Sequence, residues 1–201
     1  MIPSQTISWD AFTERFPDGE VMDRPQTRAN YDATPYTGYD DSDNEYPFLF
    51  DGETDPRAAA VDRAAALDLG TGPVAYHFDF LKENPVINDR LGDIPLLIVF
   101  DPETESAFRS YQTDGGSSTV GSSTTFNRDL DGRELTFNLV DGVLQDDQTG
   151  STWTRWGMAT AGELAGSELD PVIHGDHFWF AWAAFKTDTR LVDDLSQLVL
   201  G

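Results

Sequence analysis

Residues 94–107, IPLLIVFDPETESA, give the strongest structural signal in the chain. Six of the first seven residues are apolar, and the run ends at Asp101-Pro102. A short apolar run that stops at a turn signal is typical of a strand that is buried on both faces. We therefore predict a central strand here, with Asp101, Glu103 and Glu105 in the loop that follows it. A functional site is expected first at this strand end.

The chain is strongly acidic, with 36 Asp and Glu residues against 13 Lys and Arg and a net charge of −23. A nucleic-acid partner is not expected, because a phosphate backbone requires a basic face. Such a surface repels itself at low salt, whereas the Debye length shortens to about 3 Å at 1 M salt. We predict a halophilic protein whose acidic surface holds water and monovalent cations. The alternative is an acidic chain that binds cations or a basic partner.

The length of 201 residues and the hydrophobic fraction of 39% suit one folded domain over residues 1–201. The chain has no cysteine, which excludes disulfides and Cys-ligated metal sites. No apolar run reaches the roughly 20 residues of a membrane helix, and the first residues lack the pattern of a signal peptide. The chain as written is therefore expected in the cytoplasm, and export or a lipid anchor would require a longer, trimmed precursor.

Strands predominate in the predicted secondary structure. Asp131-Gly132 lies between two alternating segments of residues 124–139, which is the strongest short-range signal for a hairpin. The Ala-rich residues 58–66 leave a short helix as an alternative at the start of the β region. The fold class that follows is mainly β, an antiparallel sandwich or a barrel-like body. The predicted strands are residues 63–69, 73–78, 86–87, 94–100 and 151–156.

A short aromatic helix is predicted near each terminus. Residues 8–16, SWDAFTERF, place three aromatic side chains at positions i, i+3 and i+7, which form one stripe of a helix. We expect this stripe to pack on the core. Residues 177–185, HFWFAWAAF, give the second helix, which is expected to cover the other end of the β body in the same way.

Two segments lack a periodic pattern. Residues 23–55 are acidic and rich in Tyr, so they are predicted to be irregular, with tyrosine rings that attach them to the body. Residues 113–125, TDGGSSTVGSSTT, are predicted to be a flexible Gly/Ser/Thr-rich loop.

Several motifs follow one another along nearly the whole chain. They are SWDAFTERFPDGEVM, PYTGYD, VAYHFDFLKENPVINDRLGDIPLLIVFDP, RDLDGRELTF, DQTGSTW, AGELAGSELDP and a final W-x-x-W with DTR. In this order they resemble domain-of-unknown-function family thirty-one seventy-nine, which is widespread in bacteria and haloarchaea and often exported or lipid-anchored. The resemblance implies no established activity.

Two motifs that look functional in this family are altered here. The resemblance implies Cys-Pro-Leu-Cys after the central strand, a spacing that suits metal binding or thiol redox chemistry. This chain has DPET at residues 101–104. The resemblance also implies Trp-His-Glu before an Asn-Asp pair, and this chain has ENP at residues 83–85 before Asn88-Asp89. The Cys/His site is therefore predicted to be degenerate, and no catalytic residue is carried over.

An oxygen-ligand site is the alternative at the same strand end, because Ca²⁺ and Mg²⁺ prefer carboxylate and amide oxygens. Three acids at alternate positions would point to one side of an extended segment. Acids are so frequent in this chain, however, that composition alone produces such a pattern. The candidate ligands are Asp101, Glu103, Glu105, Asn84, Asp89 and His77.

A second candidate metal site consists of His174, Asp176 and His177, two imidazoles and one carboxylate within four residues. A zinc site would need a further arrangement of ligands that this spacing does not guarantee. The alternative is structural: one of these side chains caps the last helix, and His174 ends a strand. No Gly-x-Ser-x-Gly nucleophile and no phosphate-binding Gly pattern is present.

Two functions remain open from the sequence. The first is a non-catalytic halophilic binding or structural protein that keeps the scaffold of the family without its Cys/His site and without a cofactor. The second is a divalent-cation-binding protein, or a cation-dependent enzyme, that uses the acidic residues at the end of the central strand. Convergence of Asn84, Asp89 and Asp101 in one place would favour the second.

Overall fold

The computed structural model describes residues 5–23, 36, 39, 47–106 and 119–199. The helices of this part are α1 (Trp9–Arg15), α2 (Phe78–Glu83) and α3 (Trp179–Ala183), with a 3-10 turn, η1 (Leu195–Gln197). The strands are β1 (Arg63–Asp68), β2 (Pro73–His77), β3 (Val86–Leu91), β4 (Ile94–Asp101), β5 (Ser122–Asn127), β6 (Asp129–Leu130), β7 (Arg133–Glu134), β8 (Phe137–Val140), β9 (Val143–Asp146), β10 (Thr152–Trp153), β11 (Ala159–Ala161), β12 (Gly175–Phe178) and β13 (Arg190–Val192).

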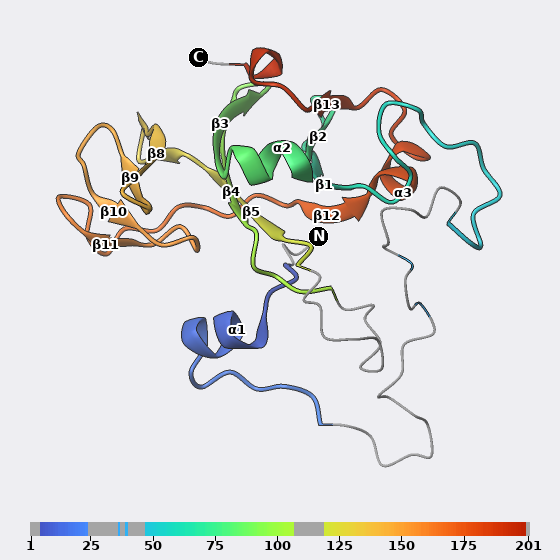
Figure 1. Ribbon diagram of the computed structural model, residues 1–201. Helices are drawn as coiled ribbons and strands as arrows, with labels where there is room; N and C mark the ends of the chain where they lie inside the picture. The colour runs from blue at the N-terminus through green and yellow to red at the C-terminus, as the bar shows by residue number, and fades with distance from the viewer. Residues whose placement is uncertain (1–4, 24–35, 37–38, 40–46, 107–118, 200–201) are drawn as a thin grey trace.

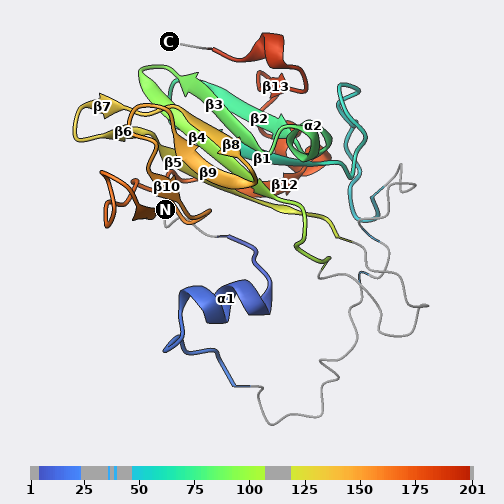
Figure 2. The same ribbon diagram turned by 60° about the vertical axis from the view of Figure 1, so that its left-hand side comes forward.

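The protein is mainly β, as predicted, and its strands form three sheets and a small ribbon (Figures 1 and 2). The sheet orders are β12-β1-β2-β13, β3-β4-β5 and β11-β10-β9-β8, with β6 and β7 as the ribbon. All pairings between these strands are antiparallel except the parallel pairing of β13 with β2. In the described part of the chain the sheets stack in layers and do not close into a barrel.

The central strand is β4, which pairs with β3 on one side and β5 on the other. Its side chains alternate between two cores. Leu96, Ile98 and Phe100 pack with side chains of β1, β2 and α2, whereas Leu97 and Val99 pack with the β8–β11 sheet. Successive side chains of a strand point to opposite faces. The apolar run of β4 therefore reflects a sheet that lies between two others.

The Ala-rich residues of β1 form a strand, so the alternative of a helix there is wrong. Ala64 and Ala66 face α3 and pack with its Trp179, whereas Ala65 and Leu67 face the core shared with β4. Small side chains let the aromatic helix lie close to the sheet. The alternation of the two faces accounts for a strand in which four successive residues are buried.

The first helix, α1, forms where it was predicted, and the Ser8 hydroxyl caps it by accepting a hydrogen bond of 3.1 Å from the Ala11 amide. Its aromatic residues pack mainly on each other: the Trp9–Phe12 and Phe12–Phe16 ring centroids are each 5.6 Å apart. Trp9 remains 61% exposed and Phe16 46%, and α1 lies apart from the sheets in both views (Figures 1 and 2). The prediction that this stripe packs on the core is wrong.

The predicted loop at residues 113–125 is wrong for its last four residues, which begin β5. Ser122, Ser123, Thr124 and Thr125 are all buried, and they pair with the end of β4. Their composition indicated flexibility, but small hydroxyl side chains also fit between packed layers when their hydroxyls find partners. Residues 113–118 lie outside the described residues, as do 24–35, 37–38 and 40–46 of the predicted irregular segment.

The turn at Asp131-Gly132 is confirmed, with positive φ at both residues, but its strands β6 and β7 are only two residues long. The flanking segments then pair elsewhere, β5 with β4 and β8 with β9. The last helix is also shorter than predicted, because His177 belongs to β12 and pairs with Ala64 of β1.

Candidate functional site at the end of β4

Asp101, the last residue of β4, lies in a network of polar side chains. Its carboxylate accepts hydrogen bonds from the Glu103 amide (3.0 Å) and the Thr104 hydroxyl (3.4 Å), and it forms an ion pair with Arg155. The Thr104 and Ser122 hydroxyls are 2.8 Å apart, and Arg155 donates to the same Ser122 hydroxyl at 3.2 Å. These four side chains bind each other, so each has a partner inside the network.

The loop after Asp101 turns instead of staying extended, which corrects the predicted arrangement of the three acids. The hydrogen bond from the Glu103 amide to the Asp101 side chain forms a tight Asx turn. Thr104 is thereby folded back and buried, whereas Glu103 and Glu105 are exposed. The acidic side chains at positions 101, 103 and 105 do not share one side.

Asn84 and His77 lie at the two ends of α2. The side-chain amide of Asn84 donates to the Phe80 carbonyl at 3.0 Å, at the C-terminal end of the helix. His77 is the N-cap residue: its Nδ1 accepts from the Asp79 amide at 3.2 Å, and its Nε2 lies 3.0 Å from the Asp62 carboxylate. The Asp62 contact raises the pKa of His77, and His77 lowers the pKa of Asp62. Both candidate ligands thus have structural partners.

Asn88 and Asp89 point to opposite faces of β3. The Asn88 side chain bonds both backbone groups of Phe137, donating to the carbonyl at 2.8 Å and accepting from the amide at 2.9 Å. Asp89 is fully buried on the other face and accepts from Tyr76. Since Asp89 pairs with Leu96 near the opposite end of β4, it does not converge with Asn84 and Asp101.

His174 and Asp176 bond the backbone of Ser123 in β5. His174 Nε2 lies 3.1 Å from the Ser123 carbonyl, and the Asp176 carboxylate accepts from the Ser123 amide (3.2 Å) and hydroxyl (2.5 Å). Burial raises the pKa of Asp176, and burial lowers the pKa of His177. The His177 ring lies against Trp182, with centroids 5.2 Å apart. The three predicted ligands therefore do not point at a common centre.

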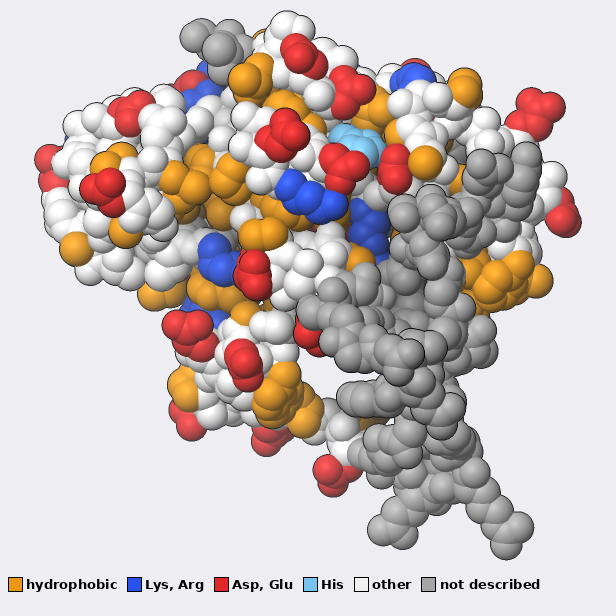
Figure 3. Space-filling view, viewed as in Figure 1, with side chains coloured by type: hydrophobic (Ala, Val, Ile, Leu, Met, Phe, Trp, Pro, Cys, Tyr) orange, Lys and Arg blue, Asp and Glu red, His pale blue; other side chains and the backbone are white. Residues whose placement is uncertain are grey.

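Metal-ligand geometry is absent from the described residues, in which no group of three or more His, Cys, Asp or Glu side chains is arranged to hold an ion. At least nine Lys and Arg side chains of this part form ion pairs with Asp or Glu. Figure 3 shows Asp and Glu side chains over the visible face, with the few blue groups next to red ones. The basic residues are paired with acids, many of them at exposed positions, and the excess charge on the surface is acidic.

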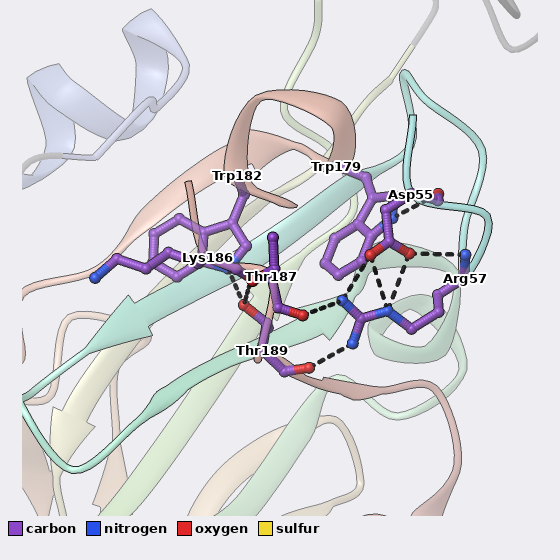
Figure 4. A network of polar contacts seen from close by, with 7 residues as sticks. All are labelled: Asp55, Arg57, Trp179, Trp182, Lys186, Thr187 and Thr189. Carbon is purple, nitrogen blue, oxygen red and sulfur yellow. Dashed lines mark hydrogen bonds and ion pairs between the residues drawn. The ribbon is translucent and has the colours of Figure 1, made fainter. Parts of the chain in front are cut away.

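The W-x-x-W and DTR motifs meet in a network that the sequence did not reveal (Figure 4). Arg57 lies over the Trp179 ring, pairs with Asp55 at 2.7 Å and donates to the Thr189 carbonyl at 2.6 Å. The Trp182 indole donates to the Thr189 hydroxyl at 2.8 Å. This network attaches α3 and the segment before β13 to the loop before β1. The only sequence signal for it was the pair of motifs itself.

The DQTGSTW motif, residues 147–153, contacts the buried carboxylate of Asp146, the residue that precedes it. This carboxylate accepts from the Thr149 amide (2.7 Å), the Thr149 hydroxyl (2.9 Å) and the Trp153 indole (3.0 Å). The carboxylate thus holds the turn between β9 and β10 and fixes the indole in the core. Its role is structural.

A family model described as "Protein of unknown function (DUF3179)" matches residues 1–189. No curated protein and no solved structure matches the chain. Within the described residues, no helix has the length and apolar character needed to cross a membrane.

Proposed function

Since the chain belongs to the DUF3179 family of proteins of unknown function, we propose that it is a non-catalytic, halophilic binding or structural protein. In this proposal it keeps the scaffold of the family without a working Cys/His site. The observation that carries the proposal is the network at the end of β4, where Asp101 and Thr104 stand at the positions of the two expected cysteines.

The proximity of these two positions supports the proposal. The Thr104 hydroxyl and the Asp101 carboxylate are 3.4 Å apart, so two thiols placed there would be close enough to act together. Arg155 neutralises Asp101 in this chain. A carboxylate that is already paired with a guanidinium is a poor ligand for a divalent cation, because binding the ion would require breaking the pair.

A calorimetric titration of the full chain with Ca²⁺, Mg²⁺ and Zn²⁺ in 3 M KCl tests this proposal. No saturable heat is expected. Asp101→Asn should leave the titration unchanged but lower the free energy of unfolding by about 1–3 kcal/mol, because Arg155 loses its charged partner. Urea unfolding in the same salt measures that loss.

Glu103→Gln is the matched control, because it removes a carboxylate from the same loop at an exposed position. It should change the free energy of unfolding by no more than about 0.5 kcal/mol. Saturable binding that Asp101→Asn abolishes and Glu103→Gln preserves would overturn the proposal in favour of a cation-binding protein.

A further inference from the structure

Residues 193–199, the C-terminal strap, form a small preorganised unit beside β13 (Figures 1 and 2). The Gln197 side chain accepts from the Asp193 and Asp194 amides, at 2.8 and 3.0 Å, and the Asp194 carboxylate accepts from the Ser196 amide at 2.8 Å. These bonds make the capping box of η1. The strap is therefore held together by hydrogen bonds of its own.

The surface beneath the strap is held in place by groups outside it. Asp89 is fully buried, and its Oδ2 accepts from the Tyr76 hydroxyl at 2.6 Å and from Arg190 Nη2 at 2.8 Å. These residues belong to β3, β2 and β13, and β13 pairs directly with β2. The contacts that hold the carboxylate to the guanidinium and to Tyr76 therefore do not involve the strap.

The other oxygen of the Asp89 carboxylate and the other terminal nitrogen of Arg190 form hydrogen bonds with the strap backbone. Asp89 Oδ1 accepts from the Val199 amide at 2.7 Å, and Arg190 Nη1 donates to the Gln197 carbonyl at 2.8 Å. The residue between them, Leu198, is extended and packs its side chain on the core. In an extended chain the carbonyl before a residue and the amide after it point to the same side. Asp89 and Arg190 therefore replace a neighbouring strand.

The strap itself buries little. Leu195 is 58% exposed and Val199 46%, and no residue of η1 is buried, so Leu198 is the main apolar anchor. Segments with few buried contacts open more readily than the core. Within the described residues the Val199 amide is the sole hydrogen-bond donor to Asp89 Oδ1. An opened strap exposes this carboxylate oxygen, which can then accept a hydrogen bond from water or from another N–H donor.

We propose that Asp89 and Arg190 form a peptide-binding site that the C-terminal strap occupies reversibly. The site takes a short extended peptide with an apolar side chain between a free carbonyl and a free amide, a strand-addition mode of recognition. The strap and Arg190 lie beyond the residues that the family model matches. The site is also distant from Asp101 along β4. A test of this site is therefore independent of the metal titration that tests the function proposed above.

The test uses a labelled peptide of residues 194–199 with blocked ends, added to the full chain in 3 M KCl. Leu198→Asp disables the strap by removing its anchor, and Leu195→Asp is the matched control at an exposed position of the same turn. Fluorescence anisotropy should show the peptide binding at least tenfold more tightly to the Leu198→Asp protein than to the unmodified protein or the control. A peptide that itself carries L198D should not bind.

Equal affinity of the three folded proteins for the peptide, or equal binding of both peptides, would overturn the proposal. Hydrogen exchange on the unmodified protein gives an independent reading if Leu198→Asp does not fold. The Val199 amide should exchange at least 100-fold faster than the Ile98 amide in β4. Equal exchange rates would mean that the strap opens only when the whole protein unfolds, which would also overturn the proposal.

Discussion

Buried and partly buried carboxylates in this protein bind the hydrogen-bond donors of their own surroundings. Asp146 holds a turn and an indole, Asp101 pairs with Arg155, and Asp89 pairs with Arg190 and Tyr76. A carboxylate that leaves water needs such partners, and each partner reduces its capacity to bind an ion. At the scale of single residues, an acidic side chain beside a strand end is therefore weak evidence for a metal site.

The Asp62–His77 pair should make the stability depend on pH. The raised pKa of His77 contributes stability that is fully present below its unfolded value of 6.5 and is lost as the pH rises through the folded value. The lowered pKa of Asp62 contributes stability above 3.8 that is lost as the pH falls through the folded value. The pair therefore stabilises the fold most between pH 3.8 and 6.5.

Urea unfolding at pH 5 and pH 8 in 3 M KCl measures the contribution of the Asp62–His77 pair to the free energy of unfolding, which should be larger at pH 5. Protonated Nδ1 can no longer accept from the Asp79 amide, but the charge-assisted contact with Asp62 is the stronger of the two. Asp62→Asn should reduce the gain in stability at pH 5 over pH 8, and Glu83→Gln, which removes an exposed carboxylate from the end of α2, should leave it intact. An unchanged advantage in Asp62→Asn would contradict the assignment.

The sheets are joined at their edges by side chains that replace backbone partners. Asn88 of β3 bonds both backbone groups of Phe137 in β8. At the other edge, His174 and Asp176 bond the carbonyl and the amide of Ser123 in β5. Residues 170–172 form backbone hydrogen bonds with β5, whereas residues 175–178, which follow in the chain, pair with β1. These side chains satisfy backbone groups where one strand leaves another.

The junction between β3 and β8 can be tested with Asn88→Ala. The change leaves the amide and the carbonyl of Phe137 without partners in a partly buried position, so we expect a loss of about 2–4 kcal/mol in the free energy of unfolding. Asn138→Ala is the control, because the Asn138 side chain bonds Asp147 on the surface. Urea unfolding that shows the same loss for both variants would count against a joining role for Asn88.

The whole molecule combines a net charge of −23 with basic residues that are mostly paired with acids. The acidic excess is spread over the surface, as Figure 3 shows for one face. At this scale the acidic charges repel each other. Low salt leaves this repulsion largely unscreened, whereas molar salt screens it. Stability should therefore rise with salt concentration.

We predict a higher unfolding temperature in 3 M KCl than in 0.1 M KCl. A gain of about 3 kcal/mol would raise the midpoint by roughly 6–12 °C for a chain of this size. Differential scanning calorimetry measures the midpoint, and 3 M sorbitol serves as a control for crowding and hydration without ionic screening. The same midpoint at both KCl concentrations would contradict the proposal that the protein is halophilic.

The β class, the position of β4, the turn at Asp131-Gly132 and the acidic surface all follow from the order and composition of the residues. These features depend on local patterns, because a strand needs alternation or a continuous apolar run and a tight turn needs residues that tolerate positive φ. Local patterns predicted the helix α1 but not that its aromatic stripe lies apart from the core, and they did not predict that Ser122 to Thr125 form a buried strand. Packing of distant segments determines whether an aromatic stripe or a hydroxyl-rich strand is buried.

Only the tertiary structure decides what the candidate ligands bind. Asn88 meets Phe137 at a separation of 49 residues, and Asp101 meets Arg155 at a separation of 54. The spacing of residues along the chain contains no information about such partners. A buried polar group takes whichever partner the stacked sheets bring to it, and in this protein those partners are other groups of the chain.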